Sequence, residues 1–101
     1  MKIFLVQRTD DIGYDEYDSV VAVAASEKQA RETHPVGHEV WCSEDLVWYT
    51  MFDDGTLSTE ASSYHGWTTD IASLKVELLG NYLGPVGSER PGPIMASFNA
   101  G

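Results

Sequence analysis

Four apolar segments of strand length recur along the chain, at residues 2–8, 19–25, 75–83 and 94–100. They are rich in aliphatic and aromatic side chains, including the β-branched types that favour strands. The first two segments flank a polar loop that contains a glycine, so we expect them to pair as antiparallel neighbours. The first is apolar at nearly every position, which predicts a strand buried on both faces.

A short helix is predicted after the second strand, beginning at Ser26 and ending at Pro35. Ser26 is a good N-cap, and Gln29 stands three residues later, as in a capping box. Pro35 ends the helix because the residue before a proline is pushed out of the α region. A single helical turn is predicted at 68–74, with Thr69 as its cap.

The middle of the chain, residues 36–66, is the hardest part to interpret. One interpretation is a second hairpin around Asp54-Gly55, a pair typical of tight hairpin turns. The other is a long loop anchored by its aromatic side chains. The predicted order is β-β-α-(β-β)-β-β in a single domain, 1–101, with 36–66 as a variable insertion. We therefore expect the α+β class, with a small mixed or antiparallel sheet and one short helix packed on one face.

Acidic residues outnumber basic ones, with sixteen Asp and Glu against six Lys and Arg, which gives a net charge of −10. No lysine or arginine lies between Arg8 and Lys28, or between Arg31 and Lys75. Nucleic acids and anionic membranes attract basic surfaces, so direct binding to either is disfavoured. A basic protein partner, or plain solubility, fits this charge better. The lone Cys42 excludes an internal disulfide, and no signal peptide or membrane span is evident, so we expect a cytoplasmic protein.

Two blocks of the sequence stand out: RTDDIGYDEYDSVVAVAASEKQARETHP at the start, and LKVELLG with ASFNAG at the end. They resemble a group of small, uncharacterised phage and prophage proteins, over roughly residues 1–35 and 67–101. The resemblance lies in an R-T-D-x-x-G-Y-D-E-Y-D-S block, a capped helix ending in His-Pro, and a terminal S-F-N-A-G. It implies a viral accessory protein that works in the host bacterial cytoplasm. Small acidic phage proteins are often inhibitors of host machinery, anti-CRISPR proteins among them, and this analogy suggests an anti-defence role.

The loop between the first two strands holds five carboxylates in nine residues, Asp10, Asp11, Asp15, Glu16 and Asp18. Their spacing departs from a calcium-binding loop, and nothing indicates the burial that a catalytic pair needs. If Glu16 and Asp18 continue a strand edge, they share one face about 6.5 Å apart. A rigid row of carboxylates of this kind would imitate the phosphates of DNA. The alternative is a solvated loop that keeps the protein soluble.

The other candidate metal ligands are three histidines and the cysteine. His34, His38 and Cys42 are spaced H-x3-H-x3-C, a loose zinc-like pattern that needs His65 as a fourth ligand. The other interpretation places His34 at the end of the helix and His38 in solvent. We expect neither a metal nor a cofactor.

Aromatic residues crowd the middle of the chain, namely Trp41, Trp48, Tyr49, Phe52, Tyr64 and Trp67. We expect them to form hydrophobic core. The alternative is an exposed interface, rich in tryptophan and tyrosine, for a protein partner or a second copy of the chain.

Together these observations predict a non-enzymatic, acidic protein of phage type that binds and inhibits a host protein complex by covering a basic, nucleic-acid-binding surface. The predicted contact residues are Asp10, Asp11, Tyr14, Asp15, Glu16, Tyr17 and Asp18, extended by Glu44, Asp45, Asp53 and Asp54. The tyrosines would act as anchors. The alternative is a phage accessory or assembly module that forms a homodimer or larger homo-oligomer through the aromatic middle, with the acids serving solubility only.

Overall fold

The structure is a computed structural model, and it describes residues 1–63, 66–82 and 91–99. The elements are β1 (Lys2–Gln7), β2 (Glu16–Ala24), α1 (Glu27–Arg31), β3 (Glu39–Cys42), β4 (Val47–Thr50), the 3-10 helix η1 (Ile71–Ser73), β5 (Lys75–Asn81) and β6 (Gly92–Asn99). This arrangement confirms the predicted α+β class, with antiparallel strands and one short α-helix. No helix within the described residues is long and apolar enough to span a membrane.

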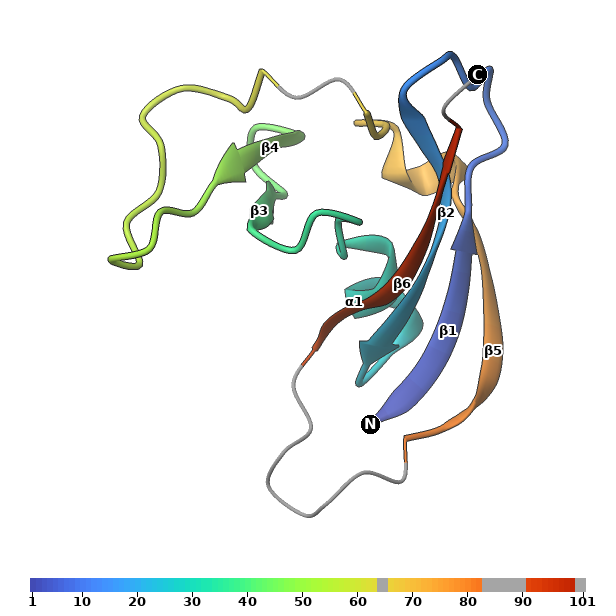
Figure 1. Cartoon of the computed structure of the whole chain (residues 1–101). Coiled ribbons are helices and arrows are strands. Elements are labelled where there is room, and N and C mark those ends of the chain that lie inside the picture. The colour runs from blue at the N-terminus through green and yellow to red at the C-terminus, as the bar shows by residue number, and fades with distance from the viewer. Residues whose placement is uncertain (64–65, 83–90, 100–101) are drawn as a thin grey trace.

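The main sheet has the strand order β5-β1-β2-β6, and every neighbouring pair is antiparallel. The predicted pairing of the first two strands is confirmed, with Val6 opposite Val20. Figure 1 shows α1 on one face of this sheet, with the small β3–β4 sheet beyond it. The loop between β1 and β2 lies at the end of the sheet away from the N-terminus.

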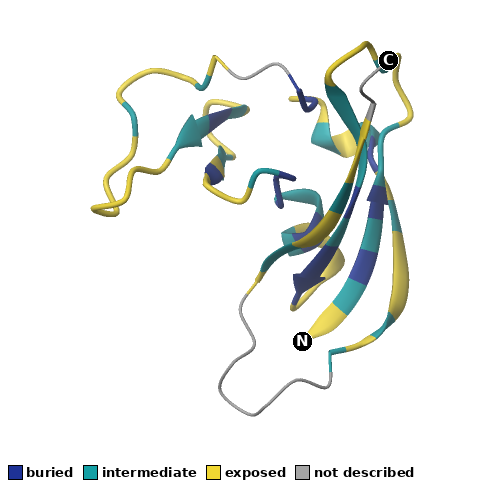
Figure 2. Cartoon of the chain, viewed as in Figure 1, coloured by how far each residue is buried: buried dark blue, intermediate teal, exposed yellow. Residues whose placement is uncertain are grey.

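Side chains of β1 alternate between the two faces of the sheet. Phe4 and Val6 are buried and pack in the same core as Ala30 of α1. Ile3 and Leu5 point to the opposite face and are only half-buried. The prediction of a strand buried on both faces is therefore wrong, because no helix among the described residues covers the second face (Figure 2).

The start of α1 is as predicted. The hydroxyl of Ser26 accepts a hydrogen bond from the backbone N–H of Gln29 at 3.2 Å. The side-chain oxygen of Gln29 reaches back to the backbone N–H of Ala25 at 2.6 Å. These two bonds resemble a capping box. The difference is that the Gln29 side chain accepts from Ala25, the residue before the N-cap, and not from Ser26 itself.

The end of α1 comes earlier than predicted. The helix stops at Arg31, well before Pro35, because Thr33 leaves the helical path to form a bridge with Val40 next to β3. Proline is therefore not the residue that terminates this helix.

The predicted helical turn at 68–74 is present as η1, but its cap differs from the prediction. Asp70, not Thr69, occupies the N-cap position, and no side chain caps the turn. The Thr68 hydroxyl instead accepts from the backbone N–H of Asp70 at 2.9 Å and shapes the approach to η1.

The second hairpin exists, but its main turn is not at the predicted position. β3 and β4 pair antiparallel and are joined by residues 43–46, where Leu46 adopts a positive φ of 56°. Asp54-Gly55 also forms a tight turn, with Gly55 at φ 85°, yet it joins only a single bridge between Met51 and Leu57. The predicted turn at Asp54-Gly55 is thus present, but the longer strand pairing, between β3 and β4, precedes it in the chain.

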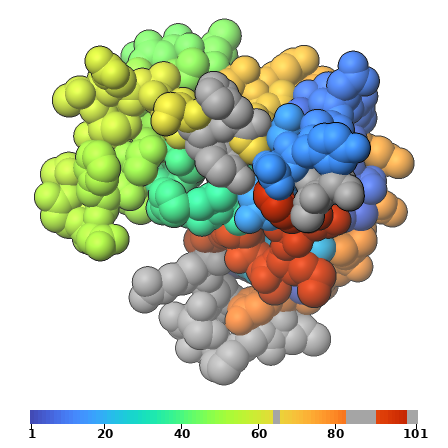
Figure 3. All heavy atoms as spheres, turned by 45° about the horizontal axis from the view of Figure 1, so that its top comes forward, coloured from blue at the N-terminus to red at the C-terminus, as the bar shows by residue number. Residues whose placement is uncertain are grey.

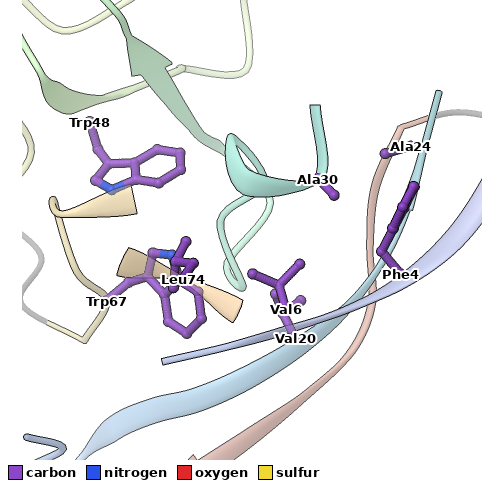
Figure 4. Packing of buried hydrophobic residues seen from close by; sticks show 8 residues of the cluster. All are labelled: Phe4, Val6, Val20, Ala24, Ala30, Trp48, Trp67 and Leu74. Atoms are coloured by element: carbon purple, nitrogen blue, oxygen red, sulfur yellow. The ribbon is translucent and has the colours of Figure 1, made fainter. Parts of the chain in front are cut away.

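One hydrophobic core joins the main sheet to the β3–β4 region (Figure 4). Val6 and Val20 form its centre, and Trp48 and Trp67 extend it towards β3 and β4, with Leu74 alongside. Trp48 donates its indole N–H to the carbonyl of Thr68 at 2.9 Å. Burial of both tryptophans confirms the interpretation of these two residues as core.

Candidate functional site

A single arginine organises the acidic loop between β1 and β2. The Arg8 guanidinium donates to both carboxylate oxygens of Asp10 at 2.8 Å and to Glu16 at 2.7 Å. It also donates to the backbone carbonyls of Asp11 and Tyr17, at 3.2 and 3.4 Å. The Arg8 side chain is only 5% exposed, so the loop is folded around it. We call this arrangement the Arg8 clasp.

The electrostatics of the clasp favour the charged forms of Arg8 and Asp10. The hydrogen bond to Asp10, followed by that to Glu16, raises the pKa of Arg8 above its ordinary value in spite of partial burial. The hydrogen bond from Arg8 lowers the pKa of Asp10. Both groups therefore remain ionised at neutral pH, and the ion pairs are hydrogen-bonded in a fixed geometry.

Gly13 is required by the clasp because the Glu16 side chain lies over it. A Cβ added at Gly13 would stand 2.7 Å from a Glu16 carboxylate oxygen, an impossibly short contact. Since Arg8 holds the other oxygen of that carboxylate, a shift of the Glu16 side chain to make room would strain the ion pair. The loop thus combines an arginine, a glutamate and a glycine that fix one another.

The tip of the loop presents the groups that the clasp leaves free for solvent. Tyr14 is 78% exposed, and Asp11 and Asp15 on either side of it are exposed as well. Asp15 has a positive φ of 60°, a conformation that Asp and Asn tolerate better than most residues. The tip of the loop therefore exposes one aromatic ring and two carboxylates.

The hypothesis of a carboxylate row along a strand edge is wrong in its geometry. β2, which holds Glu16 and Asp18, lies between β1 and β6 and is not an edge strand. A register irregularity between Tyr17 and Ser19 also breaks the regular alternation that would put the two acids on one face. Glu16 turns towards Arg8, and Asp18 accepts from the Ser19 hydroxyl at 3.1 Å.

The two predicted tyrosine anchors have different environments. Tyr17 is half-buried, and its ring packs against Phe98 with centroids 4.9 Å apart. Its backbone N–H donates to the carbonyl of Gly66 at 2.9 Å. Tyr17 is therefore part of the framework, and Tyr14 is the tyrosine presented at the surface.

The second acidic group does not extend the first. Glu44 and Asp45 lie in the β3–β4 turn, and Asp53 and Asp54 lie in the turn that follows β4. Figure 3 shows these green segments across the view from the blue β1–β2 loop, with the segment around η1 between them. Asp45 accepts from the Tyr49 hydroxyl at 2.6 Å and raises the pKa of that tyrosine. Bonds from Thr56 lower the pKa of Asp54 and close its turn.

The zinc-like spacing of histidines and cysteine does not produce a ligand cluster. No group of three or more metal-ligating side chains comes together among the described residues, and His65 lies outside them. His34 is buried against Trp48, with ring centroids 4.9 Å apart, and its Nδ1 accepts from the backbone N–H of Val36. Burial, with a smaller effect from His38, lowers the pKa of His34 to about 4, so the ring is neutral. The interpretation that places His34 at the end of the helix is right only in outline, because α1 stops at Arg31 and the His34 ring is buried beyond it. His38 is exposed, as predicted.

Only part of the aromatic middle reaches the surface. With Trp48 and Trp67 in the core, Trp41 and Tyr49 are half-buried and Phe52 is 53% exposed. Tyr64 lies outside the described residues. A homo-oligomer interface through the aromatic middle would therefore lack Trp48 and Trp67, which are buried in the core.

A buried carboxylate at the start of β3 was not predicted from the sequence. The Glu39 side chain is 4% exposed and accepts from the hydroxyls of Thr50 and Ser62 at 3.0–3.3 Å. It borders a pocket of about 270 Å³ between α1, β3 and the start of β6. Its partners come from the β3–β4 region itself, so we assign it a role in holding Ser62 against the hairpin.

The Arg8 clasp also escaped the sequence analysis, although a signal was present. Arg8 stands just before the acidic run, and the next basic residue is Lys28, so no opposite charge lies nearer to these carboxylates in the sequence than Arg8. Compared with known proteins, the chain matches no protein-family model, no curated protein and no solved structure. Its function is therefore argued from the loop and its surroundings.

Proposed function

We propose that this protein is a non-enzymatic binding protein that docks its β1–β2 loop on a basic, nucleic-acid-binding surface of another protein and blocks it. The observation that carries the proposal is the Arg8 clasp. It fixes the loop and leaves Asp11, Tyr14 and Asp15 exposed at its tip.

Preorganisation makes such a loop a better ligand than a flexible acidic segment. Association costs the ordering of side chains and loops at the interface, and a loop already held by Arg8 has met that cost during folding. Tyr14 supplies a rigid aromatic contact with few rotatable bonds. Two flanking carboxylates complement lysine and arginine on the partner and speed the encounter.

Charge favours a basic partner over an acidic or neutral one. Five carboxylates between Asp10 and Asp18 against one arginine leave the loop at net −4, within a chain of net −10. By the resemblance to phage and prophage proteins, the proposed target is a bacterial complex that handles nucleic acid. This analogy also underlies the proposed anti-CRISPR-like or other anti-defence role.

Affinity capture from a bacterial lysate tests the proposal, with the tagged protein at about 0.1 M and about 0.5 M salt. We expect a nucleic-acid-handling protein to be retained at low salt and released at high salt. The double substitution Asp11→Asn/Asp15→Asn should abolish capture, because it removes both free charges at the tip. Asparagine keeps the shape of each side chain and tolerates the positive φ at position 15.

A matched control separates a local effect from the loss of net charge. Glu44→Gln/Asp53→Asn also removes two negative charges, but from exposed positions in the distant turns, and it should leave capture intact. Equal loss with both variants would mean that only overall charge matters. A partner that is insensitive to salt and to the loop variant would overturn the proposal.

A further inference from the structure

We infer that β6 is an open edge through which two copies of this chain pair, so that their four-stranded sheets join into one. β6 is the last strand of the order β5-β1-β2-β6. One side of it pairs with β2, and no other strand among the described residues lies along its outer side. An edge strand presents backbone N–H and C=O groups that bind another extended chain.

The side chains of this edge strand are exposed and apolar. Ile94 is 55% exposed, Met95 69% and Phe98 44%. In Figure 3 the red atoms of β6 form a broad area of the visible surface. Ala96 lies between these side chains and packs on the core, so the strand itself is anchored to the fold.

Met95 also ends an apolar row that crosses the uncovered face of the sheet. Leu5 pairs with Val21, and Val21 pairs with Met95, so the three side chains lie side by side on one face. Beyond Met95 the row meets solvent. A strand added at this edge would continue the row and cover the methionine.

The two edges of the sheet differ in their charge. β5 carries Lys75 and Glu77, and its register shifts opposite Ile3 and Phe4, which are devices that discourage edge pairing. β6 carries no charged residue between Gly92 and Asn99. Its pairing with β2 shifts register at two places, between Pro93 and Met95 and again between Ser97 and Phe98, where the extra residue lies on β2. The residues of β6 from Met95 to Asn99 still pair one after another with none skipped.

A second copy is the occupant that fits this edge best. Antiparallel pairing of a strand with itself is two-fold symmetric, so each copy offers the same surface to the other. In a register centred on Ala96, Ile94 of one copy would lie opposite Phe98 of the other. Aromatic and β-branched side chains form favourable cross-strand pairs. A neutral strand brings no like charges face to face, even in a protein of net −10.

The charge of the whole chain sets the expected response to salt. Two chains of net −10 repel each other, and salt screens that repulsion over about 8–10 Å at moderate ionic strength. Dimerisation through β6 should therefore strengthen as salt rises. Docking of the acidic loop on a basic partner should weaken under the same change, so failure of one proposal is distinguishable from failure of the other.

Sedimentation equilibrium of the purified chain tests the inference, over about 10 µM to about 1 mM protein. The mass should rise from 11.1 kDa towards twice that value, and the transition should move to lower concentration with added salt. Ile94→Lys/Met95→Lys should keep the mass at the monomer value throughout. The two added lysines reduce the net negative charge, so this loss cannot be attributed to greater repulsion between chains.

The matched control places the same two lysines on the other edge. Leu78 and Leu79 of β5 are 55% and 53% exposed, and Leu78→Lys/Leu79→Lys should still dimerise. Thermal unfolding at low concentration should be similar for the two variants, which shows that both are folded. A wild-type chain that stays monomeric at about 1 mM, or a dimer that survives the β6 substitutions, would overturn the inference.

Discussion

Replacement of Arg8 by glutamine is the change that most directly tests the clasp. Two ion pairs are lost, and their environments set the size of the effect. The Asp10 side chain is 41% exposed, so its pair with Arg8 resembles a surface salt bridge and contributes about 0.5 kcal/mol. The Glu16 side chain is 27% exposed, and its 2.7 Å hydrogen bond to a well-covered guanidinium contributes about 1.5 kcal/mol.

The expected loss is therefore about 2 kcal/mol in the free energy of unfolding, because the two long bonds to backbone carbonyls add little. For a domain of this length, that corresponds to a fall of about 8–16 °C in the midpoint of thermal unfolding. Urea unfolding at neutral pH measures the loss. A double-mutant cycle with Glu16→Gln should assign the larger share to Glu16, and one with Asp10→Asn the smaller share.

The pH dependence gives an independent check on the same contacts. Since Arg8 lowers the pKa of Asp10 in the folded protein, this contribution is fully present above the ordinary carboxyl pKa and is lost as the pH falls through the lowered value. The difference in stability between wild type and Arg8→Gln should thus narrow at acid pH by the Asp10 share, about 0.5 kcal/mol. A loss below about 0.5 kcal/mol at neutral pH, within the range of ordinary surface substitutions, would refute the clasp as an organising contact.

Three further predictions concern the rest of the fold. The pKa of His34, about 4, lies below the ordinary 6.5, so protonation of this buried ring disfavours the folded state. The free energy of unfolding should fall by about 3 kcal/mol as the pH drops from 6.5 to 4, and His34→Phe should remove most of that fall. Urea unfolding across this pH range measures both. Gly55→Ala should cost about 1 kcal/mol through its φ of 85°, whereas Gly80→Ala, with open space and no positive φ, should be neutral or slightly stabilising; the reverse order would contradict the backbone argument. Ser26→Ala should lower the free energy of unfolding by about 1 kcal/mol because it removes the helix cap. Ser26→Asp keeps a capping oxygen and should be close to wild type, as measured by thermal unfolding.

Local sequence patterns were sufficient for the strand segments of the main sheet, for the pairing of β1 with β2 and for the start of the helix. The apolar runs that became β1 and β2 are short and dense, and the loop between them carries a glycine, so their pairing followed from composition and length. Ser26 with Gln29 marked the first helical turn correctly. These features depend on residues that are near one another in the chain.

The errors came from contacts that local patterns do not contain. The β3–β4 turn ends on Leu46 in a left-handed conformation, without the glycine or asparagine that usually marks such a turn. The helix ended early because Thr33 pairs with Val40. The acidic loop was treated as five separate charges, and its order depends on Arg8, at the end of the preceding strand, which lies buried among them.

The central claim is that the loop tip occupies a surface meant for nucleic acid, and a competition measurement tests it most directly. The partner captured from lysate is bound to a fluorescent oligonucleotide, and anisotropy is followed as the protein is added. The account predicts displacement, with the Asp11→Asn/Asp15→Asn variant at least about tenfold weaker, or about 1.4 kcal/mol, and the Glu44→Gln/Asp53→Asn variant unchanged. An oligonucleotide that stays bound while the protein also binds would contradict the account.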